Sequence, residues 1–245
     1  MKATKLHGLF KLCQITSDIE KVNFNYDKSN KTVVLEFMES KARIIGIIES
    51  SYSPDINIES KICIPKVSEL LQILSNCGEN TTLENNFGPV LKIEDIDTAL
   101  KASYYIFQES ECVKIFRPKN NMLDGDRIEM EIDPKKILSI LATIKSMSGC
   151  SKVNIYTTVE SSEVHFKISQ TDDSESFGII PIPVTIAHTI NDDYNFNLDI
   201  DIVQKVLDLN KKATKVDMII YNNILLKLKF THKDDTITTY YLPVI

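Results

Sequence analysis

The sequence predicts an α+β fold of two similar domains, each with two helices packed on antiparallel β-sheets. Four segments place apolar residues at helical spacing, and short β-rich runs divided by turn residues fill the chain between them. The second pair of helices follows the first pair at nearly the same sequence distance, with β-rich runs in matching places. Each half therefore repeats helix, strands, helix, strands, which is typical of a duplicated unit.

The helices are predicted from apolar residues that recur every three to four positions along one face. Their predicted ranges, in chain order, are Lys2–Thr16, Pro65–Gly78, Asp133–Ser148 and Asp199–Lys212. Pro65 suits a first helical position, Gly78 suits a C-terminal cap, and Asp133 suits an N-cap before Pro134.

The strands are predicted from runs rich in β-branched and aromatic residues. In the first half these runs are "KTVVLEF", "ARIIGII", "INIESKICI", "TTLENN", "PVLKIED" and "ALKASYYIF". In the second half they are "KVNIYTTV", "EVHFKIS", "SFGIIPIPV", "NFNLDI", "KVDMIIY", "ILLKLKF" and "ITTYYLPVI".

A linker is predicted between the two halves. The stretch from Gln108 to Arg127 contains Pro118 and the Asp124–Gly125 turn, which are typical of connecting segments. We therefore predict an N-terminal domain over 1–107, a connecting linker over 108–127 and a C-terminal domain over 128–245. The centre of the linker, "VKIF", is apolar, so it could pack on the body of the protein or frame a binding groove.

Charge is distributed unevenly along the chain. The protein is acidic overall, with 34 acids, 28 bases and a formal net charge of −6, yet the segment Pro134–Gly149 holds lysines and no acid. A solvated helix usually mixes both signs and gains i,i+4 pairs. A positive helical layer on an acidic body suits a polyanion held by its phosphates. A few surface lysines can also mean only a solvated face, and both readings stay open at this point.

Catalytic and metal-binding motifs are missing from the sequence. The cysteines and histidines are dispersed, and no glycine-rich phosphate loop occurs. The pairs Asp95/Asp97 and Asp199/Asp201 fit turns and helix caps better than a metal site. We expect no enzyme activity, no cofactor and no metal. The sequence also shows no signal peptide and no membrane-spanning run, so we expect a cytoplasmic protein.

Several stretches resemble the DNA sliding clamps, and most of all the polymerase processivity factor of T-even-type tailed bacteriophages. They are "MKATK" at the start, "ICIPKVSELLQILSNCGENTTLENNFGPVLKIEDIDTALKASYYIF", and "IEMEIDPKKILSILATIKSMSGCSKVNIYTTVESSEVHFKIS". The C-terminal "TTYYLPVI" is similar to the end of proliferating cell nuclear antigen, the cellular clamp. The resemblance covers nearly the whole chain as a pattern of elements rather than as one diagnostic motif.

The resemblance implies a DNA clamp fold and a homotrimeric ring that encircles double-stranded DNA without reading its sequence. It also implies two further partners, a DNA polymerase for processive replication and a clamp loader, and no membrane. If the protein is viral, its location is the host cell cytoplasm. The helical lysines would line the ring and face DNA: Lys2, Lys5, Lys11, Lys66, Lys135, Lys136, Lys145, Lys205, Lys211 and Lys212.

The resemblance implies two further surfaces. Neighbouring subunits would join through the edge strands "TALKASYYIF" and "SFGIIPIPV", where the candidates are Tyr104, Tyr105, Phe177 and Ile179. Core packing explains those four side chains equally well. Tails of partner proteins would insert in an apolar groove beneath the linker, lined by Met38, Ile44, Val113, Ile115, Phe116, Pro243 and Val244. The alternative function is a two-domain β-rich structural protein, such as a virion or scaffold component, that does not encircle DNA.

Overall fold

The computed structural model describes residues 3–51, 56–58, 61–86, 88–115, 118, 123, 127–148, 152–158, 163–169, 176–183, 193–221 and 224–243. Contacts divide the chain into two compact units. Unit 1 is Met1–Phe116 with Lys233–Thr238, and unit 2 is Arg117–His232 with Thr239–Ile245. The main division falls inside the predicted linker, while the domain limits 1–107, 108–127 and 128–245 remain a prediction.

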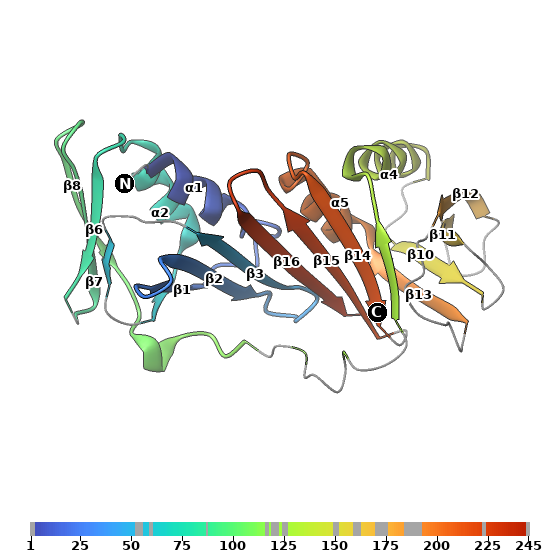
Figure 1. The fold of residues 1–245 in the computed structure, drawn as a ribbon, viewed down its shortest axis with the longest axis horizontal. Coiled ribbons are helices and arrows are strands. Elements are labelled where there is room, and N and C mark those ends of the chain that lie inside the picture. Colours follow the sequence, from blue (N-terminus) through green and yellow to red (C-terminus); the bar gives the residue numbers. More distant parts are fainter. Residues whose placement is uncertain are drawn as a thin grey trace. The chain divides into compact units, whose positions relative to one another are not determined.

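Unit 1 contains two helices and two groups of strands (Figure 1). Its elements are α1 (Ala3–Lys11), β1 (Val22–Asp27), β2 (Thr32–Met38), β3 (Ile45–Ser51), β4 (Ile56–Ile58), β5 (Ile62–Ile64), α2 (Val67–Ser75), β6 (Thr81–Asn85), β7 (Val90–Asp95), β8 (Leu100–Tyr105) and the 3₁₀ helix η1 (Glu109–Glu111). The strands are ordered β5-β1-β2-β3 in one group and β4-β6-β7-β8 in the other.

Unit 2 repeats this plan. Its elements are β9 (Arg127–Glu131), α4 (Pro134–Ser148), β10 (Lys152–Thr157), β11 (Glu163–Ser169), β12 (Ser176–Pro183), β13 (Tyr194–Asp199), α5 (Ile200–Leu209), β14 (Lys215–Tyr221), β15 (Leu225–Thr231) and the larger part of β16 (Thr236–Pro243), whose residues up to Thr238 belong to unit 1. The strand orders are β13-β10-β11-β12 and β9-β14-β15-β16. The units differ in one outer strand: β4 follows β3 in the chain and runs parallel to β6, whereas β9 precedes α4 and runs antiparallel to β14.

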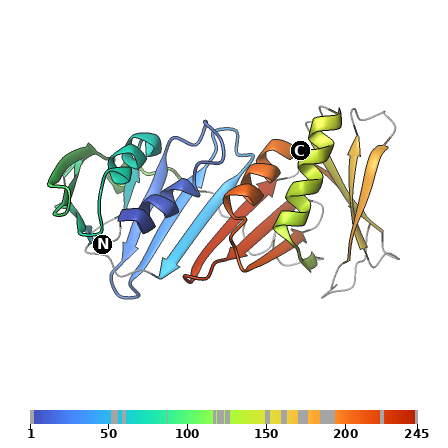
Figure 2. The ribbon, with the colours of Figure 1, turned by 90° about the horizontal axis from the view of Figure 1, so that it is seen from above.

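The helices of each unit pack against each other, α1 with α2 and α4 with α5 (Figure 2). In α2 the buried residues are Val67, Leu70, Leu71 and Leu74, and in α5 they are Ile200, Ile202, Val203, Val206 and Leu207. This is the apolar stripe that the sequence spacing predicts. Burying each such side chain contributes roughly 1.5–3 kcal/mol. The predicted α+β class, with helices packed on antiparallel sheets, is confirmed.

Several predicted helix ends differ from the structure: α1 ends at Lys11 rather than Thr16, and α5 ends at Leu209 rather than Lys212. Pro65 and Lys66 precede α2, and Lys66 is its N-cap residue, so Pro65 is not in the first turn. At the other end the C-cap is Asn76 rather than Gly78. Gly78 instead donates its backbone N–H to Asp95 at 3.0 Å, which ties the end of the helix to β7.

A close fit fixes the faces of β2 and β3. Phe37 is fully buried and lies opposite Gly46, and a Cβ on Gly46 would lie 2.1 Å from the Phe37 ring. The glycine therefore makes room for the aromatic ring. Because side chains alternate along a strand, Met38 and its partner Ile45 lie together on the opposite face of the sheet.

Candidate functional site

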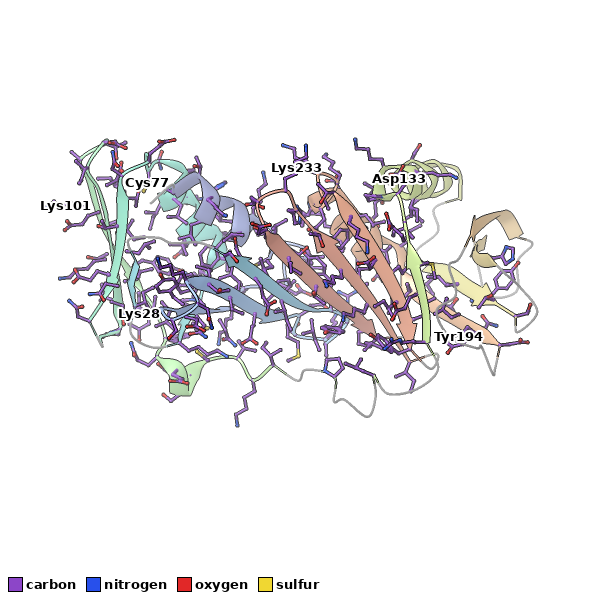
Figure 3. All side chains as sticks on the ribbon, in the orientation of Figure 1. Lys28, Cys77, Lys101, Asp133, Tyr194 and Lys233 are labelled. Atoms are coloured by element: carbon purple, nitrogen blue, oxygen red, sulfur yellow. The ribbon has the colours of Figure 1, made fainter. Side chains whose placement is uncertain are left out.

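The exposed face of α4 carries lysines and short side chains. Asp133, labelled in Figure 3, accepts hydrogen bonds from the backbone N–H groups of Lys135 (2.9 Å) and Lys136 (3.4 Å), so it caps the helix as expected. Ile137 and Leu141 point into the core. On the other side Lys135, Lys136, Ser139 and Ala142 are exposed. The side chain of Lys145 lies outside the described residues.

Three of the predicted DNA-facing lysines have acidic partners. Lys66 Nζ lies 2.8 Å from Glu69, Lys211 lies 3.0 Å from Asp208, and Lys5 lies 3.3 Å from Asp234. A hydrogen bond and the charge of Glu69 raise the pKa of Lys66. Exposed pairs of this kind contribute little to stability. They do reduce the positive potential that reaches solvent.

The other predicted lysines are exposed without an acidic partner within ion-pair distance among the described residues. They are Lys11, Lys135, Lys136, Lys205 and Lys212. Lys2 lies outside the described residues. The acid-free part of the lysine set therefore lies mainly on α4 and around α5. Its role toward DNA remains a prediction.

A groove of about 570 Å³ lies between α2 and β8. Tyr104 lines it and is only 6% exposed, and its hydroxyl donates to the Lys66 carbonyl at 2.7 Å and lies 3.1 Å from the Lys66 backbone nitrogen. Burial raises the pKa of Tyr104 to about 12. Tyr105, the next residue, is 57% exposed. Of the two tyrosines, Tyr104 thus serves to fix β8 to the start of α2, and Tyr105 is the one that a second molecule can reach.

Both segments predicted to join subunits lie at sheet edges. β8 ends the order β4-β6-β7-β8, and β12 ends the order β12-β11-β10-β13. Figure 3 shows Lys101 on β8. The side chains of Phe177 and Ile179 in β12 lie outside the described residues. An edge strand has unpaired backbone groups along one side, which is the chemical requirement for adding another strand.

The residues predicted to line a partner groove are placed in both units. Met38, Val113 and Ile115 are half-buried in unit 1, and Pro243 is half-buried in unit 2. Ile44 is fully buried and has no surface to offer a peptide; its neighbour Ile45 lies opposite Met38 instead. Phe116 and Val244 lie outside the described residues.

The aspartate pairs act as local anchors. Asp95 is buried, and hydrogen bonds led by the Thr98 hydroxyl lower its pKa to about 2. Asp97 accepts from the backbone N–H groups of Glu79 and Asn80, both at 2.9 Å. Asp199 caps α5 by accepting from the Asp201 and Ile202 N–H groups. These bonds occupy the carboxylates in turns and caps.

The described residues contain neither a metal-binding cluster nor a membrane-spanning helix. Within the described ranges, no three or more His, Cys, Asp or Glu side chains group so as to hold a metal ion. Cys13, Cys63, Cys77 and Cys112 are free thiols. The described helices include none that is both long and apolar enough to cross a membrane.

The fold is that of the sliding clamps. PCNA from Thermococcus kodakaraensis matches with a TM-score of 0.70 and 12% sequence identity, over 100% of this chain and 98% of that chain. A chain of the PCNA2–PCNA3 complex from Sulfolobus tokodaii matches with a TM-score of 0.67 and 13% identity, over 100% of this chain and 97% of that chain. No family model and no curated protein matches. The predicted DNA clamp fold is confirmed, and the likeness to the phage clamp remains a prediction.

Proposed function

We propose that this chain is a DNA sliding clamp, which closes with two further copies into a ring around duplex DNA and tethers a DNA polymerase. The observation that carries the proposal is the exposed face of α4, where lysines stand without acids on an acidic protein that has the clamp fold. Lysines bind the phosphate backbone without reading sequence. A ring needs such weak, sequence-independent contacts because tight binding would stop it from sliding.

Ring closure is proposed to join β8 of one copy to β12 of the next. The two strands are unlike edges of one chain, so their contact is heterologous and head-to-tail, and such contacts form closed rings when the rotation between copies allows it. The exposed Tyr105 and the groove beside β8 offer contact surface at this edge. Phe177 and Ile179 on β12 are the proposed counterparts.

Partner proteins are proposed to bind the apolar surface formed by Met38, Ile45, Val113 and Ile115. These half-buried or nearly buried side chains suit the anchors of a short peptide. A polymerase and a clamp loader are the proposed partners. We place the protein in T-even-type phage DNA replication, in the host cytoplasm, on the resemblance of its sequence.

The test combines the mass of the assembly with its retention on circular and on linear DNA. Sedimentation equilibrium should give three copies per particle, and loaded protein should stay on nicked circular DNA but leave the same DNA once it is cut. Ends release a ring but not a protein that grips DNA locally. A stable assembly with no retention on circles would favour the structural alternative. A monomer at the concentrations that support processive synthesis would overturn the ring.

A further inference from the structure

Asn23 in β1 makes an unusual contact with a segment 90 residues later. Its side-chain nitrogen donates to the Val113 carbonyl at 2.7 Å, and its side-chain oxygen accepts from the Val113 N–H at 2.9 Å. Asn23 is fully buried. It lies opposite Glu36 on β2 and opposite Cys63 on β5, with the connector over it. Its carboxamide therefore satisfies both backbone groups of one connector residue, as a neighbouring strand would.

The connector has a second anchor six residues earlier. Phe107 forms an isolated β-bridge with Cys63, with both N–H···O bonds at 2.9 Å. Between the anchors lies η1, closed by a bond from the Gln108 backbone N–H to the Glu111 carboxylate at 3.1 Å. The segment from Phe107 to Val113 is thus fixed at both ends to the sheet of unit 1.

The backbone of the connector beyond Val113 offers free hydrogen-bonding groups. In an extended chain the backbone groups of successive residues point to opposite sides, so an extended connector directs those of Lys114 away from Asn23. Cys112 has extended backbone angles, φ −61° and ψ 147°. Lys114 is exposed, and its backbone groups have no partner within the part of the chain that the structure describes. The half-exposed apolar side chains of Val113 and Ile115 flank it.

We propose that Asn23 is a positioning residue that fixes the register of the connector and so presents a ready edge to an extended partner peptide with apolar side chains. This inference rests on the proposed clamp function. The peptide would pair with the open backbone of Lys114 and place apolar residues on Val113 and Ile115, a mode in which backbone bonds give affinity and side chains give specificity. A pre-ordered edge saves the cost of ordering the connector on binding.

The test compares Asn23→Leu with Asn25→Leu. Leucine is close in shape to asparagine but cannot hydrogen-bond, and Asn25 is an exposed residue two positions along the same strand. Hydrogen exchange of the Val113 amide should speed up at least about tenfold in Asn23→Leu and stay unchanged in Asn25→Leu. The Cys63 and Phe107 amides should stay protected in both. Asn23→Ser, whose shorter side chain cannot span the contact, should reproduce the result if the leucine variant folds poorly.

The functional readout is primer extension with the replicative polymerase and clamp loader that accompany this chain. The polymerase concentration for half-maximal processive synthesis should rise about tenfold in Asn23→Leu, while the maximal product length and the mass of the assembly stay as in the wild type. An unchanged half-maximal concentration, with wild-type protein active, would overturn the positioning role. Wild-type protein that never stimulates the polymerase would instead overturn the clamp function, and with it the proposed role of the Asn23–Val113 contact in peptide binding.

Discussion

Units 1 and 2 share a plan of two packed helices and two strand groups but differ in how their helical lysines are neutralised. In unit 1 the lysines Lys5 and Lys66 both have acidic partners, which leaves Lys11 alone among the described lysines of the predicted set. In unit 2 Lys211 is paired, whereas Lys135, Lys136, Lys205 and Lys212 are exposed and have no acid within ion-pair distance among the described residues. The two units therefore share a similar topology but not the same distribution of charge on their helices. Positive surface available to phosphates comes mainly from unit 2.

The open edges differ as well. β8 in unit 1 has no proline, whereas β12 in unit 2 contains Pro181 and Pro183. Pro181 and Pro183 lie opposite His165 and Glu163 of β11, in an edge strand, which is where prolines within sheets usually occur. Because proline has no backbone N–H, β12 has two fewer backbone donors than a strand without prolines. Such prolines protect an edge strand against unwanted pairing with another chain.

The largest expected effect tests the charge difference. Lys135→Glu/Lys136→Glu in unit 2 should reduce the amount of clamp retained on circular DNA about a hundredfold at physiological salt, because each subunit loses two phosphate contacts. Lys66→Glu/Lys211→Glu reverses the same number of charges at paired lysines and should cost only a few-fold. Retention assays over a salt series would show this as a shallower slope for the first variant. Equal losses in the two variants would remove the distinction between paired and unpaired lysines.

A second prediction separates the neighbours Tyr104 and Tyr105 on the unit 1 edge. Tyr104→Phe leaves the Lys66 backbone groups without their buried partner, so it should lower the free energy of unfolding by about 1–3 kcal/mol in urea titrations. Tyr105→Phe removes an exposed hydroxyl and should change little.

Tyr104 also makes the stability of the fold depend on pH. The folded pKa of Tyr104 is about 12, above its ordinary value of 10.0, so the folded state holds the phenol proton more tightly than the unfolded state. The contribution of the protonated Tyr104 to the free energy of unfolding is complete below pH 10.0 and is lost as the pH rises toward about 12. Tyr104→Phe should therefore lose less stability over that window than the wild type. If the free energy of unfolding falls equally steeply with pH in both proteins, the raised pKa does not belong to Tyr104.

The third prediction concerns the unit 2 edge. Pro181→Val/Pro183→Val restores two donors to β12 and should produce particles larger than the trimer, seen several-fold more often in native mass spectra. Pro89→Val, in the loop before β7, is the control. If the double variant sediments as the wild type does, the prolines do not guard the edge.

Sequence patterns located the helices because their core faces repeat within a few residues, but long-range contacts were not predictable. β1 was not predicted, since Asn23 and Asn25 are unfavourable in strands, and the connector contact that favours Asn23 lies 90 residues away. β9, "RIEME", was also not predicted, because charges fill its outward positions. The pattern of "INIESKICI" predicts a single strand, but the segment forms β4 and β5, which belong to different strand groups.

The candidate sites were limited in the same way. The sequence analysis assigned Ile44 to the partner groove, but whether Ile44 or Ile45 lies beside Met38 depends on strand pairing. A shift of one residue moves every side chain of a strand to the other face. The packing of Phe37 against Gly46 decides which side chains of β2 and β3 lie on each face. The pairing of Lys5 with Asp234 joins the two ends of the sequence. No local pattern could distinguish Lys5 from the unpaired Lys135.

The smallest expected effect sharpens the comparison of α1 with α4. Gly8 lies in the interior of α1, is exposed, and has open space around the position of a Cβ, whereas α4 carries the exposed Ala142. Glycine in a helix interior costs about 0.5–1 kcal/mol relative to alanine, mainly through the freedom of the unfolded chain. Gly8→Ala should therefore raise the free energy of unfolding by that amount in urea titrations, and leave DNA retention unchanged because no charge is altered. A loss of retention with normal stability would show instead that DNA approaches the backbone of α1, and would give unit 1 a larger share of the DNA surface than its lysines indicate.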